Sequence, residues 1–469
     1  MELLSYSHGD SATDGGDGYH RCVIFKGRGG TGKSRSTNAV RLSVDTCEEA
    51  AFATTGKAAT AINASTVFSK KHGLALPVGK TKYKPLQGRN LQEAQRRFKH
   101  LKLVHLDEYT MLDQKQLHFM NLRLQEIKAN RSVFGGVVIV LCGDTAQLPP
   151  VQGRCLWEKS RSKATSEALA GMKLYFEEFL TVVELKENMR LNRDDPDADS
   201  YESFLNRLAD GECTDNDWRT VRDKCSRDTL GQAEWDRRGF SADDVTYLFP
   251  TNKQVQEENH RRIRKVGKPI LKIESHNSSA RAKSFPADKF CGLQNKVYLC
   301  VEAMVVLTMN LLPEYGLANG STGTVKDFVW EGDDRPQETP PTFVWVEFGD
   351  EYDGPSFFPR NPTRKGWVPV IRLTKDHFTT SRSGSTYDTH TRSMIPLRLA
   401  WAWTIWKAQG QTIKGILVIN LGEKEQEHGL SYVAFSRSTI FQNVGVQGGL
   451  SGKRLTECIS KQKKTEETP

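Results

Sequence analysis

Four short apolar runs lie in the first 150 residues, and nearly every position in each run is apolar. This pattern is typical of strands in a parallel sheet, because both of their faces are buried. Helix-compatible stretches separate the runs, so the pattern predicts a doubly wound α/β domain. The expected strands are residues 22–27, 49–54, 101–108 and 136–144, and the expected helices are 34–44, 90–100 and 114–130.

The pattern changes twice along the chain. Residues 70–95 are rich in Lys, Gly and Pro and too short for a core, which predicts a small insertion projecting from the first domain. Within residues 321–395, stretches such as "TFVWVEFG" mix apolar and polar positions between turns, which predicts a small antiparallel barrel. A second α/β unit is expected around that barrel, with strands in "YLFPTN" (247–252) and "GILVINL" (415–421).

These patterns predict a full domain plan for the 469 residues. The plan comprises a flexible N-terminus (1–19), a first domain (20–165), a second domain (166–320 plus 396–450), an inserted domain (321–395) and a flexible tail (451–469).

Composition narrows the class of protein. The net charge of +9 permits a polyanionic partner without requiring one. No apolar run approaches the roughly 18 residues of a membrane span, and the N-terminus lacks a signal-peptide pattern, so no membrane partner is expected. Nine scattered cysteines without a CxxC spacing disfavour a zinc site and favour a reducing, intracellular compartment.

"GRGGTGKS" (27–34) fits the phosphate-loop pattern GxxxxGK(S/T) between an expected strand and an expected helix. Glycines let backbone N–H groups turn toward phosphate oxygens, and the helix N-terminus favours the same anion. Lys33 would reach the β- and γ-phosphates of ATP, and the Ser34 hydroxyl would bind Mg²⁺. A glycine turn with a surface lysine is the alternative. The predicted nucleotide-binding residues of the loop are Gly27, Gly29, Gly30, Thr31, Gly32, Lys33 and Ser34.

An acidic pair, Asp107-Glu108, ends the strand in "LVHLDEY". Asp107 would hold Mg²⁺ through water, and Glu108 would orient and deprotonate the attacking water. Such a pair alone is more often a helix cap. Together with the phosphate loop it favours ATP hydrolysis over nucleotide binding alone.

Five further stretches resemble the ordered motifs of superfamily 1 helicases. They are "TTGKAATAINASTVFS" (54–69, motif Ia), "VVIVLCGDTAQLPPV" (137–151, motif III), "ELKENMRL" (184–191, motif IV), "AWTIWKAQGQT" (402–412, motif V) and "GLSYVAFSR" (429–437, motif VI). The resemblance implies that Gln147 senses the γ-phosphate and that Arg190 and Arg437 are arginine fingers from the second domain. It also places Gln409 at the nucleotide.

The segment "DQKQLHFMNLRLQEIKANRSVFGG" (113–136) resembles the signature helix of the petite-integration-frequency helicases of superfamily 1B. That resemblance implies two RecA-like domains, with a wedge insertion matching 70–95 and an SH3-like insertion matching 321–395. It implies ATP- and Mg²⁺-dependent 5′→3′ movement on single-stranded DNA and unwinding of forked duplex. We expect the chain to be active as a monomer. By motif match, Thr55, Lys57, Thr66 and Lys407 would contact DNA.

Aromatic residues replace two family histidines, at Phe68 and Trp406. Stacking on DNA bases is one interpretation, because base–aromatic stacking tolerates any sequence; packing in the core is the other. Trp401 and Trp403 are expected in the core.

The first glutamine of the chain is Gln87, so the adenine-reading glutamine of the family has no counterpart upstream of the phosphate loop, and we expect weak discrimination among purine triphosphates.

Three alternatives remain open at this point. One is an RNA helicase or a translocase that does not unwind, since 2′-OH discrimination cannot be predicted from sequence. Another is a nucleotide-gated binding module without catalysis, which the joint presence of the six expected catalytic residues disfavours. The basic run "HRRIRKVGK" (260–268) is either part of the DNA track or a solvated helix face.

Overall fold

The computed structural model describes residues 21–62, 64–69, 72–77, 82–150, 153–159, 164–331, 339–380, 387–448 and 450–456. They form two compact units, one from residues up to 238 together with those from 405 onward, the other from 239–404. None of the helices in the described ranges combines the length and apolar character that crossing a membrane requires.

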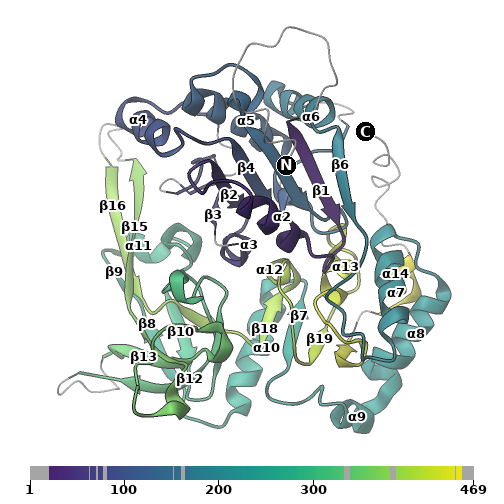
Figure 1. Cartoon of the computed structure of the whole chain (residues 1–469). Coiled ribbons are helices and arrows are strands. Elements are labelled where there is room, and N and C mark those ends of the chain that lie inside the picture. The colour runs from purple at the N-terminus through teal and green to yellow at the C-terminus, as the bar shows by residue number, and fades with distance from the viewer. Residues whose placement is uncertain are drawn as a thin grey trace. The chain divides into compact units, whose positions relative to one another are not determined.

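A six-stranded parallel sheet forms the centre of the first unit (Figure 1). Its strand order is β3-β2-β4-β5-β1-β6, and the pairings are parallel throughout. The predicted doubly wound α/β fold is therefore confirmed for this part of the chain. The strands are β1 (Cys22–Gly27), β2 (Glu49–Ala53), β3 (Ser65–Thr66), β4 (Leu103–Asp107), β5 (Val138–Gly143) and β6 (Thr181–Leu185).

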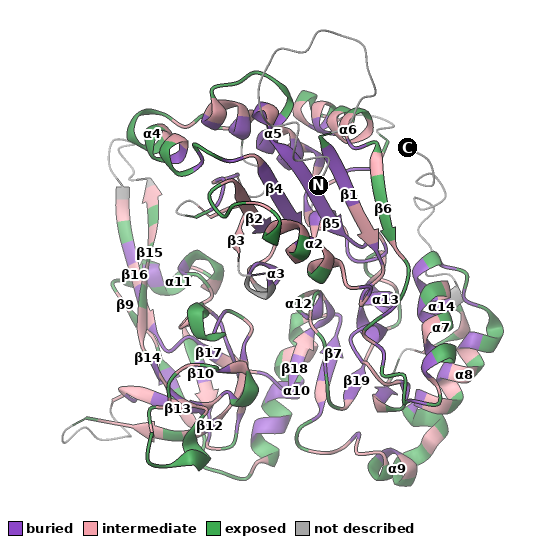
Figure 2. Ribbon diagram, viewed as in Figure 1, coloured by how far each residue is buried: buried purple, intermediate pink, exposed green. Residues whose placement is uncertain are grey.

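Both faces of the central strands are covered, which explains their continuous apolar sequences. Ile24, Leu106 and Leu141 belong to the main core on one face, whereas Leu103 and Val138 form a smaller cluster on the other. Figure 2 shows the central strands buried and the edge strand β6 largely exposed.

Helices flank this sheet on both faces. α2 (Lys33–Leu42) packs on β1 and β5, and its Val40 joins the smaller cluster. α4 (Gly88–Arg97), α5 (Gln114–Lys128) and α6 (Ser166–Glu178) pack against one another, with α5 between the other two. A capping box starts α5, because the Asp113 side chain accepts from the N–H of Gln116 and the Gln116 side chain accepts from the N–H of Asp113.

The rest of the first unit is mostly helical and carries the predicted motif VI and residues 405–412 of motif V. Parallel strands β19 (Leu417–Ile419) and β20 (Val444–Val446) pair beside these helices. The helices are α3 (Gly56–Ala61), α7 (Ala198–Asp210), α8 (Asp215–Cys225), α9 (Arg227–Arg237), α12 (Ile405–Ala408), α13 (Leu430–Phe435) and α14 (Gly452–Thr456).

An antiparallel sheet of order β14-β13-β12-β11-β17 dominates the second unit, which has its own core. A long hairpin of β15 and β16 pairs with β9, β10 pairs with β8, and β18 runs parallel to β7. The strands are β7 (Thr246–Phe249), β8 (Leu271–Glu274), β9 (His276–Asn277), β10 (Lys296–Leu299), β11 (Met304–Leu307), β12 (Thr322–Val329), β13 (Phe343–Glu347), β14 (Trp367–Ile371), β15 (Leu373–Thr380), β16 (Tyr387–Met394), β17 (Leu397–Leu399) and β18 (Ala402–Thr404). The helices are α10 (Asn252–Lys265) and α11 (Ala280–Ser284).

Three strands, β6, β11 and β17, do not follow the predicted domain plan. β6 was expected in the second domain but is an edge strand of the first sheet, so residue 165 is not a border of that sheet. β11 and β17 lie outside 321–395 yet join the antiparallel strands predicted there. The assignment of those strands to an SH3-like barrel stays a prediction.

The predicted wedge at 70–95 does not simply project from the first domain. Leu74 and Leu76 are buried in the main core, and Arg97 donates to the carbonyl of Gly73. Tyr83 donates to Glu126 of α5 over 2.6 Å between the two oxygens. Residues 70, 71 and 78–81 lie outside the described residues. The described part of the segment is thus fixed to the domain by apolar and polar contacts.

Candidate functional site

The predicted catalytic segments meet at the carboxyl edge of the parallel sheet. β4, β5 and β1 are neighbours in the strand order, and Asp107 of β4 is level with Cys142 of β5, which is level with Phe25 of β1. The phosphate loop begins two residues after Phe25. Strand ends of this kind are where ligands bind in open parallel sheets.

The phosphate loop has the backbone that its glycines permit. Gly30 and Gly32 have φ values of 95° and 82°, which L-residues with side chains rarely adopt. The Lys33 ammonium donates to the carbonyls of Gly27 and Arg28 over 2.8 and 2.9 Å. Lys33 therefore lies along its own loop, and its contact with nucleotide phosphates stays a prediction.

Two distant arginines approach this loop. A β-carbon placed on Gly29 would lie 3.4 Å from Nη1 of Arg190 and 3.6 Å from Nη2 of Arg437. The N–H of Met189 also donates to the carbonyl of Gly30 over 2.9 Å. Both arginines belong to the same compact unit as the loop, whereas the sequence placed them in a second domain.

Arg437 is fully buried at the end of α13. Its guanidinium donates to the carbonyls of Val433 and Gln411 and to the hydroxyl of Ser436. Burial and the neighbouring Arg190 lower the pKa of Arg437 to about 10, and burial also lowers the pKa of Arg190. Two cations held together at a phosphate loop favour an anionic ligand there.

Asp107 and Glu108 are held in defined positions. The N–H of Glu108 donates to Oδ1 of Asp107 over 2.9 Å, and the Thr54 hydroxyl donates to the carbonyl of Glu108 over 2.8 Å. Glu108 has a φ of 52°, an uncommon backbone for a residue with a side chain, and such strain concentrates at functional sites. Burial and Glu108 raise the pKa of Asp107 to about 6, while Lys33 opposes this shift.

These residues fit Mg²⁺ in kind. A hydroxyl from Ser34 and a carboxylate from Asp107 are oxygen ligands of the type that Mg²⁺ shares with nucleotide phosphates. The buried carboxylate has an acidic neighbour, so a cation beside it would favour its charged form. Groups of three or more His, Cys, Asp or Glu able to hold a metal do not occur among the residues with described positions.

The structure adds Asp144 and Tyr432, for which the sequence motifs predict no role. Gln147 donates to Asp144 over 3.2 Å between Nε2 and Oδ2, and the Tyr432 hydroxyl donates to the same oxygen over 2.9 Å. Tyr432 also accepts from the N–H of Gly29 over 3.0 Å. Both residues lie inside the quoted motifs, "GDTAQ" and "LSYVAF", but only the fold brings those motifs together.

Gln409 connects motif V to the acidic pair. Its amide nitrogen lies 3.2 Å from Oε2 of Glu108, to which it donates. The Oε1 atoms of Gln409 and Gln147 are buried, and neither has a hydrogen-bond partner within the described ranges. Buried amide oxygens of this kind normally accept a hydrogen bond, so an ordered water molecule or a donor group of a bound ligand would satisfy them.

The residues predicted to contact DNA lie in or next to β3, α3 and α12. The Thr55 hydroxyl accepts from the N–H of Ala58, Thr66 is half-buried in β3, and Lys407 is exposed on α12. The side chain of Lys57 lies outside the described residues. Phe68 is half-buried and packs against the main core, which favours the packing interpretation. Their roles at DNA stay predictions.

The tryptophan-rich stretch 401–406 contains three different environments. Trp401 is only 2% exposed and its indole donates to the carbonyl of Asp243 over 3.0 Å, which confirms its place in a core. Trp403 is half-buried instead of fully buried, and its indole donates to the carbonyl of Ala400. Trp406 is half-buried on α12.

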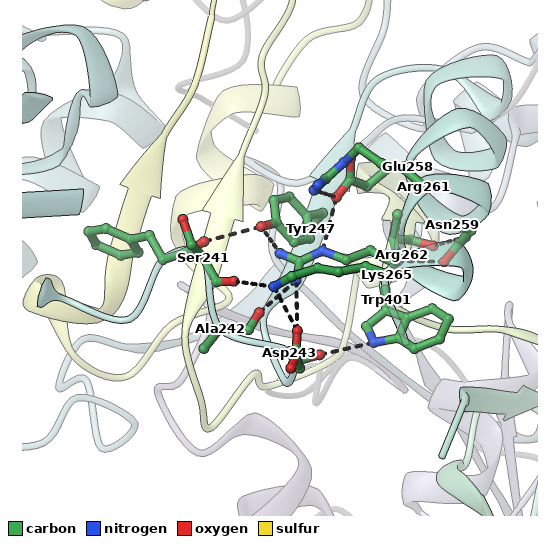
Figure 3. A network of polar contacts seen from close by, with 12 residues as sticks. Ser241, Ala242, Asp243, Tyr247, Glu258, Asn259, Arg261, Arg262, Lys265 and Trp401 are labelled. Carbon is green, nitrogen blue, oxygen red and sulfur yellow. Dashed lines mark hydrogen bonds and ion pairs between the residues drawn. The ribbon is translucent and has the colours of Figure 1, made fainter. Parts of the chain in front are cut away.

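Several basic side chains of the run 260–268 form hydrogen bonds and ion pairs within the second unit (Figure 3). Arg262 is buried and donates to Glu258 and to the carbonyl of Ala242, while Lys265 forms an ion pair with Asp243 at 2.8 Å. Arg261 pairs with Glu258 as well. This run therefore stabilises α10, and its charges are less suited to a DNA track than the sequence alone allowed.

Comparison with known proteins agrees with the motif pattern. The family model "PIF1-like helicase" matches residues 17–219. The human ATP-dependent DNA helicase PIF1 is 26% identical over 433 residues, which cover 90% of this chain and 58% of the human protein. The Trypanosoma brucei ATP-dependent DNA helicase PIF7 is 25% identical over 455 residues, covering 92% of this chain and 44% of that protein. The chain thus spans about half the length of these two relatives.

Solved structures of similar fold come from the same group of proteins. The Pif1 helicase of Candida albicans has a TM-score of 0.67 at 24% identity and covers 91% of both chains. The Pif1 helicase of Bacteroides solved with ADP-AlF3 and single-stranded DNA has a TM-score of 0.66 at 20% identity, covering 92% of this chain and 90% of that one. With the phosphate loop, the acidic pair and the two arginines assembled as above, residues 17–219 match the PIF1-like helicase model, and the chain is similar to helicases of that family.

Proposed function

We propose that this chain is an ATP-dependent DNA helicase that moves 5′→3′ on single-stranded DNA and unwinds forked duplex. The observation that carries the proposal is the approach of Arg190 and Arg437 to Gly29 of the phosphate loop. Phosphoryl transfer is catalysed by positioning and charge, so guanidinium groups beside the phosphates are what hydrolysis needs and what binding alone does not.

Each remaining group has a role in this proposal. Lys33 and the N–H groups of the loop would hold the phosphates, and Ser34 and Asp107 would hold Mg²⁺, which neutralises phosphate charge when bound. Glu108 would take the proton of the attacking water. Gln147, held by Asp144, would lie near the γ-phosphate.

Coupling to DNA is supported by the hydrogen bond between Gln409 and Glu108. Gln409 follows Trp406 and Lys407 by two to three residues, so a strand bound at these two side chains would act on the helix that leads into Gln409. The named relatives are DNA helicases, and the Bacteroides relative was solved with single-stranded DNA, which supports DNA as the polymer.

ATP hydrolysis with and without single-stranded DNA tests the proposal. We expect DNA to stimulate hydrolysis by the unaltered chain, and Lys33→Ala to abolish it. Arg35→Ala removes an exposed cation from the same helix and serves as the matched control, with activity retained. A rate of ATP hydrolysis that is the same with and without DNA and is unchanged in Lys33→Ala would contradict the proposal.

A further inference from the structure

The hydroxyl of Tyr432 joins three segments that are far apart in the sequence. It accepts from the N–H of Gly29 over 3.0 Å and donates to Oδ2 of Asp144 over 2.9 Å. Oδ2 of Asp144 also accepts from the amide of Gln147. The phosphate loop, motif III and motif VI are therefore linked through one oxygen atom.

Charge and burial fix the direction of these hydrogen bonds. Burial and Asp144 raise the pKa of Tyr432, so its phenol keeps its proton and can donate. Burial alone would raise the pKa of Asp144, but Lys33 and Arg28 hold it below its ordinary value. A neutral phenol that donates to a carboxylate is a charge-assisted hydrogen bond, which is stronger than a neutral pair.

The Gly29 N–H belongs to the part of the loop that would face phosphate oxygens. A single N–H has one well-aligned acceptor at a time, so the phenol of Tyr432 and a phosphate oxygen compete for it. When phosphate takes the N–H, Tyr432 keeps its bond to Asp144 and loses its bond to the loop. Tyr432, which loses or keeps the Gly29 N–H in this exchange, is thus hydrogen-bonded to Asp144, the residue that also holds Gln147.

We propose that Tyr432 is a positioning residue that yields the Gly29 N–H to a nucleotide phosphate and transmits the exchange to Asp144 and Gln147. The inference rests on the nucleotide function proposed above. Tyr432 also lies on α13, whose carboxyl end leads into Arg437, so the same exchange bears on the second arginine. The phenol need not touch the reacting atoms for this role.

Tyr432→Phe tests the exchange, because it removes the oxygen and keeps the ring. Freed of its competitor, the Gly29 N–H is expected to bind the fluorescent nucleotide N-methylanthraniloyl-ADP about tenfold more tightly, equivalent to about 1.4 kcal/mol. Since Asp144 loses a donor, kcat for ATP hydrolysis is expected to fall about tenfold. Tighter binding with slower turnover is a combination that mere loosening of the fold does not give.

Tyr201→Phe is the matched control. Tyr201 is equally buried, and its hydroxyl donates over 2.6 Å to the carbonyl of Phe435 at the end of the same helix α13. We expect this variant to change the melting temperature without tightening nucleotide binding. Equal or weaker ADP binding by Tyr432→Phe, or equal tightening by Tyr201→Phe, would overturn the inference.

The two proposals fail in different ways. If the unaltered chain binds the fluorescent ADP but hydrolyses no ATP, the proposed function is wrong, and the affinity comparison still tests Tyr432. If hydrolysis is normal and Tyr432→Phe binds ADP no more tightly, only the role of Tyr432 is wrong. Absence of ADP binding by the unaltered chain would overturn both.

Discussion

The side-chain amide of Gln409 donates a hydrogen bond to the carboxylate of Glu108, with 3.2 Å between Nε2 and Oε2. Glu108 directly follows β4, and Gln409 follows the short helix that carries Trp406 and Lys407. This contact gives the predicted DNA-binding stretch a direct connection to the predicted catalytic base.

Gln409→Ala is expected to reduce the stimulation of ATP hydrolysis by single-stranded DNA at least tenfold, because the connection to Glu108 is lost. Hydrolysis without DNA should change less. Gln411→Ala is the control, since its backbone carbonyl, the acceptor for Arg437, is unchanged. Full stimulation in Gln409→Ala would refute the proposed coupling.

Glu108→Gln is expected to lower kcat for ATP hydrolysis by about 10²–10⁴-fold, the usual contribution of a general base. Nucleotide affinity should be retained, because the amide keeps the size of the carboxylate. Single-turnover hydrolysis and ADP titration separate the two effects. Glu93→Gln changes an exposed carboxylate on α4 and should leave both unaltered; unchanged turnover in Glu108→Gln would show that another group is the base.

Arg190→Ala is expected to reduce kcat by about 10³-fold or more, the lower limit for an arginine finger, with a small effect on nucleotide affinity. Arg193→Ala is a close control in the same segment, because Arg193 forms surface ion pairs with Asp199 and Glu202. A similar loss in both variants would indicate a structural effect of the segment. Steady-state kinetics over a range of ATP concentrations distinguishes kcat from KM.

His105 predicts an acid-sensitive fold. Burial and Arg41 lower the pKa of His105 to about 3. Below pH 6.5 the unfolded chain therefore protonates His105 more readily than the folded chain does. The stability from neutral His105 is complete above that pH and is lost as the pH falls toward 3. Between pH 6.5 and 5 the loss should be about 2 kcal/mol, at 1.36 kcal/mol per pH unit.

His105→Val should remove that part of the pH dependence, because the neighbouring core on this face of the sheet is apolar. Denaturant unfolding at pH 5 and pH 7 measures it, with His100→Gln as an exposed control. An equal loss of stability in His105→Val and the unaltered chain would assign the acid sensitivity to other groups.

Alanine substitutions of Phe68 and Trp406 should distinguish a role in core packing from a role in DNA binding. Phe68→Ala is expected to lower the melting temperature, because Phe68 packs against the main core. Trp406→Ala is expected to weaken single-stranded DNA binding by about 1–3 kcal/mol with little change in melting temperature. Fluorescence anisotropy and thermal unfolding on the same samples test both; a lower melting temperature with normal DNA affinity in Trp406→Ala would make it a packing residue.

The regular elements near the phosphate loop could be predicted because their signals are local. β1 spans the predicted residues 22–27, and α5 begins at the predicted residue 114 with its capping box. Other features depend on pairing between distant segments. β6 extends the first sheet although an exposed edge strand carries a weaker apolar signal, and Leu74 fills a core that its own short segment could not form.

The same distinction applies to the candidate site. Lys33, Asp107 and Glu108 lie in short patterns that specify their chemistry, so they could be found one motif at a time. Asp144 and Tyr432 have no such pattern of their own, because their hydrogen bond joins residues 288 positions apart. Only the fold identifies them.

Unwinding of tailed duplexes tests both the proposed helicase activity and its direction. Substrates with a 5′ or a 3′ single-stranded tail, made with DNA or RNA strands, are incubated with and without ATP and Mg²⁺. We expect ATP-dependent separation of the 5′-tailed DNA duplex and little separation of the 3′-tailed one. Separation that favours 3′ tails or RNA strands, or that proceeds without ATP, would contradict it.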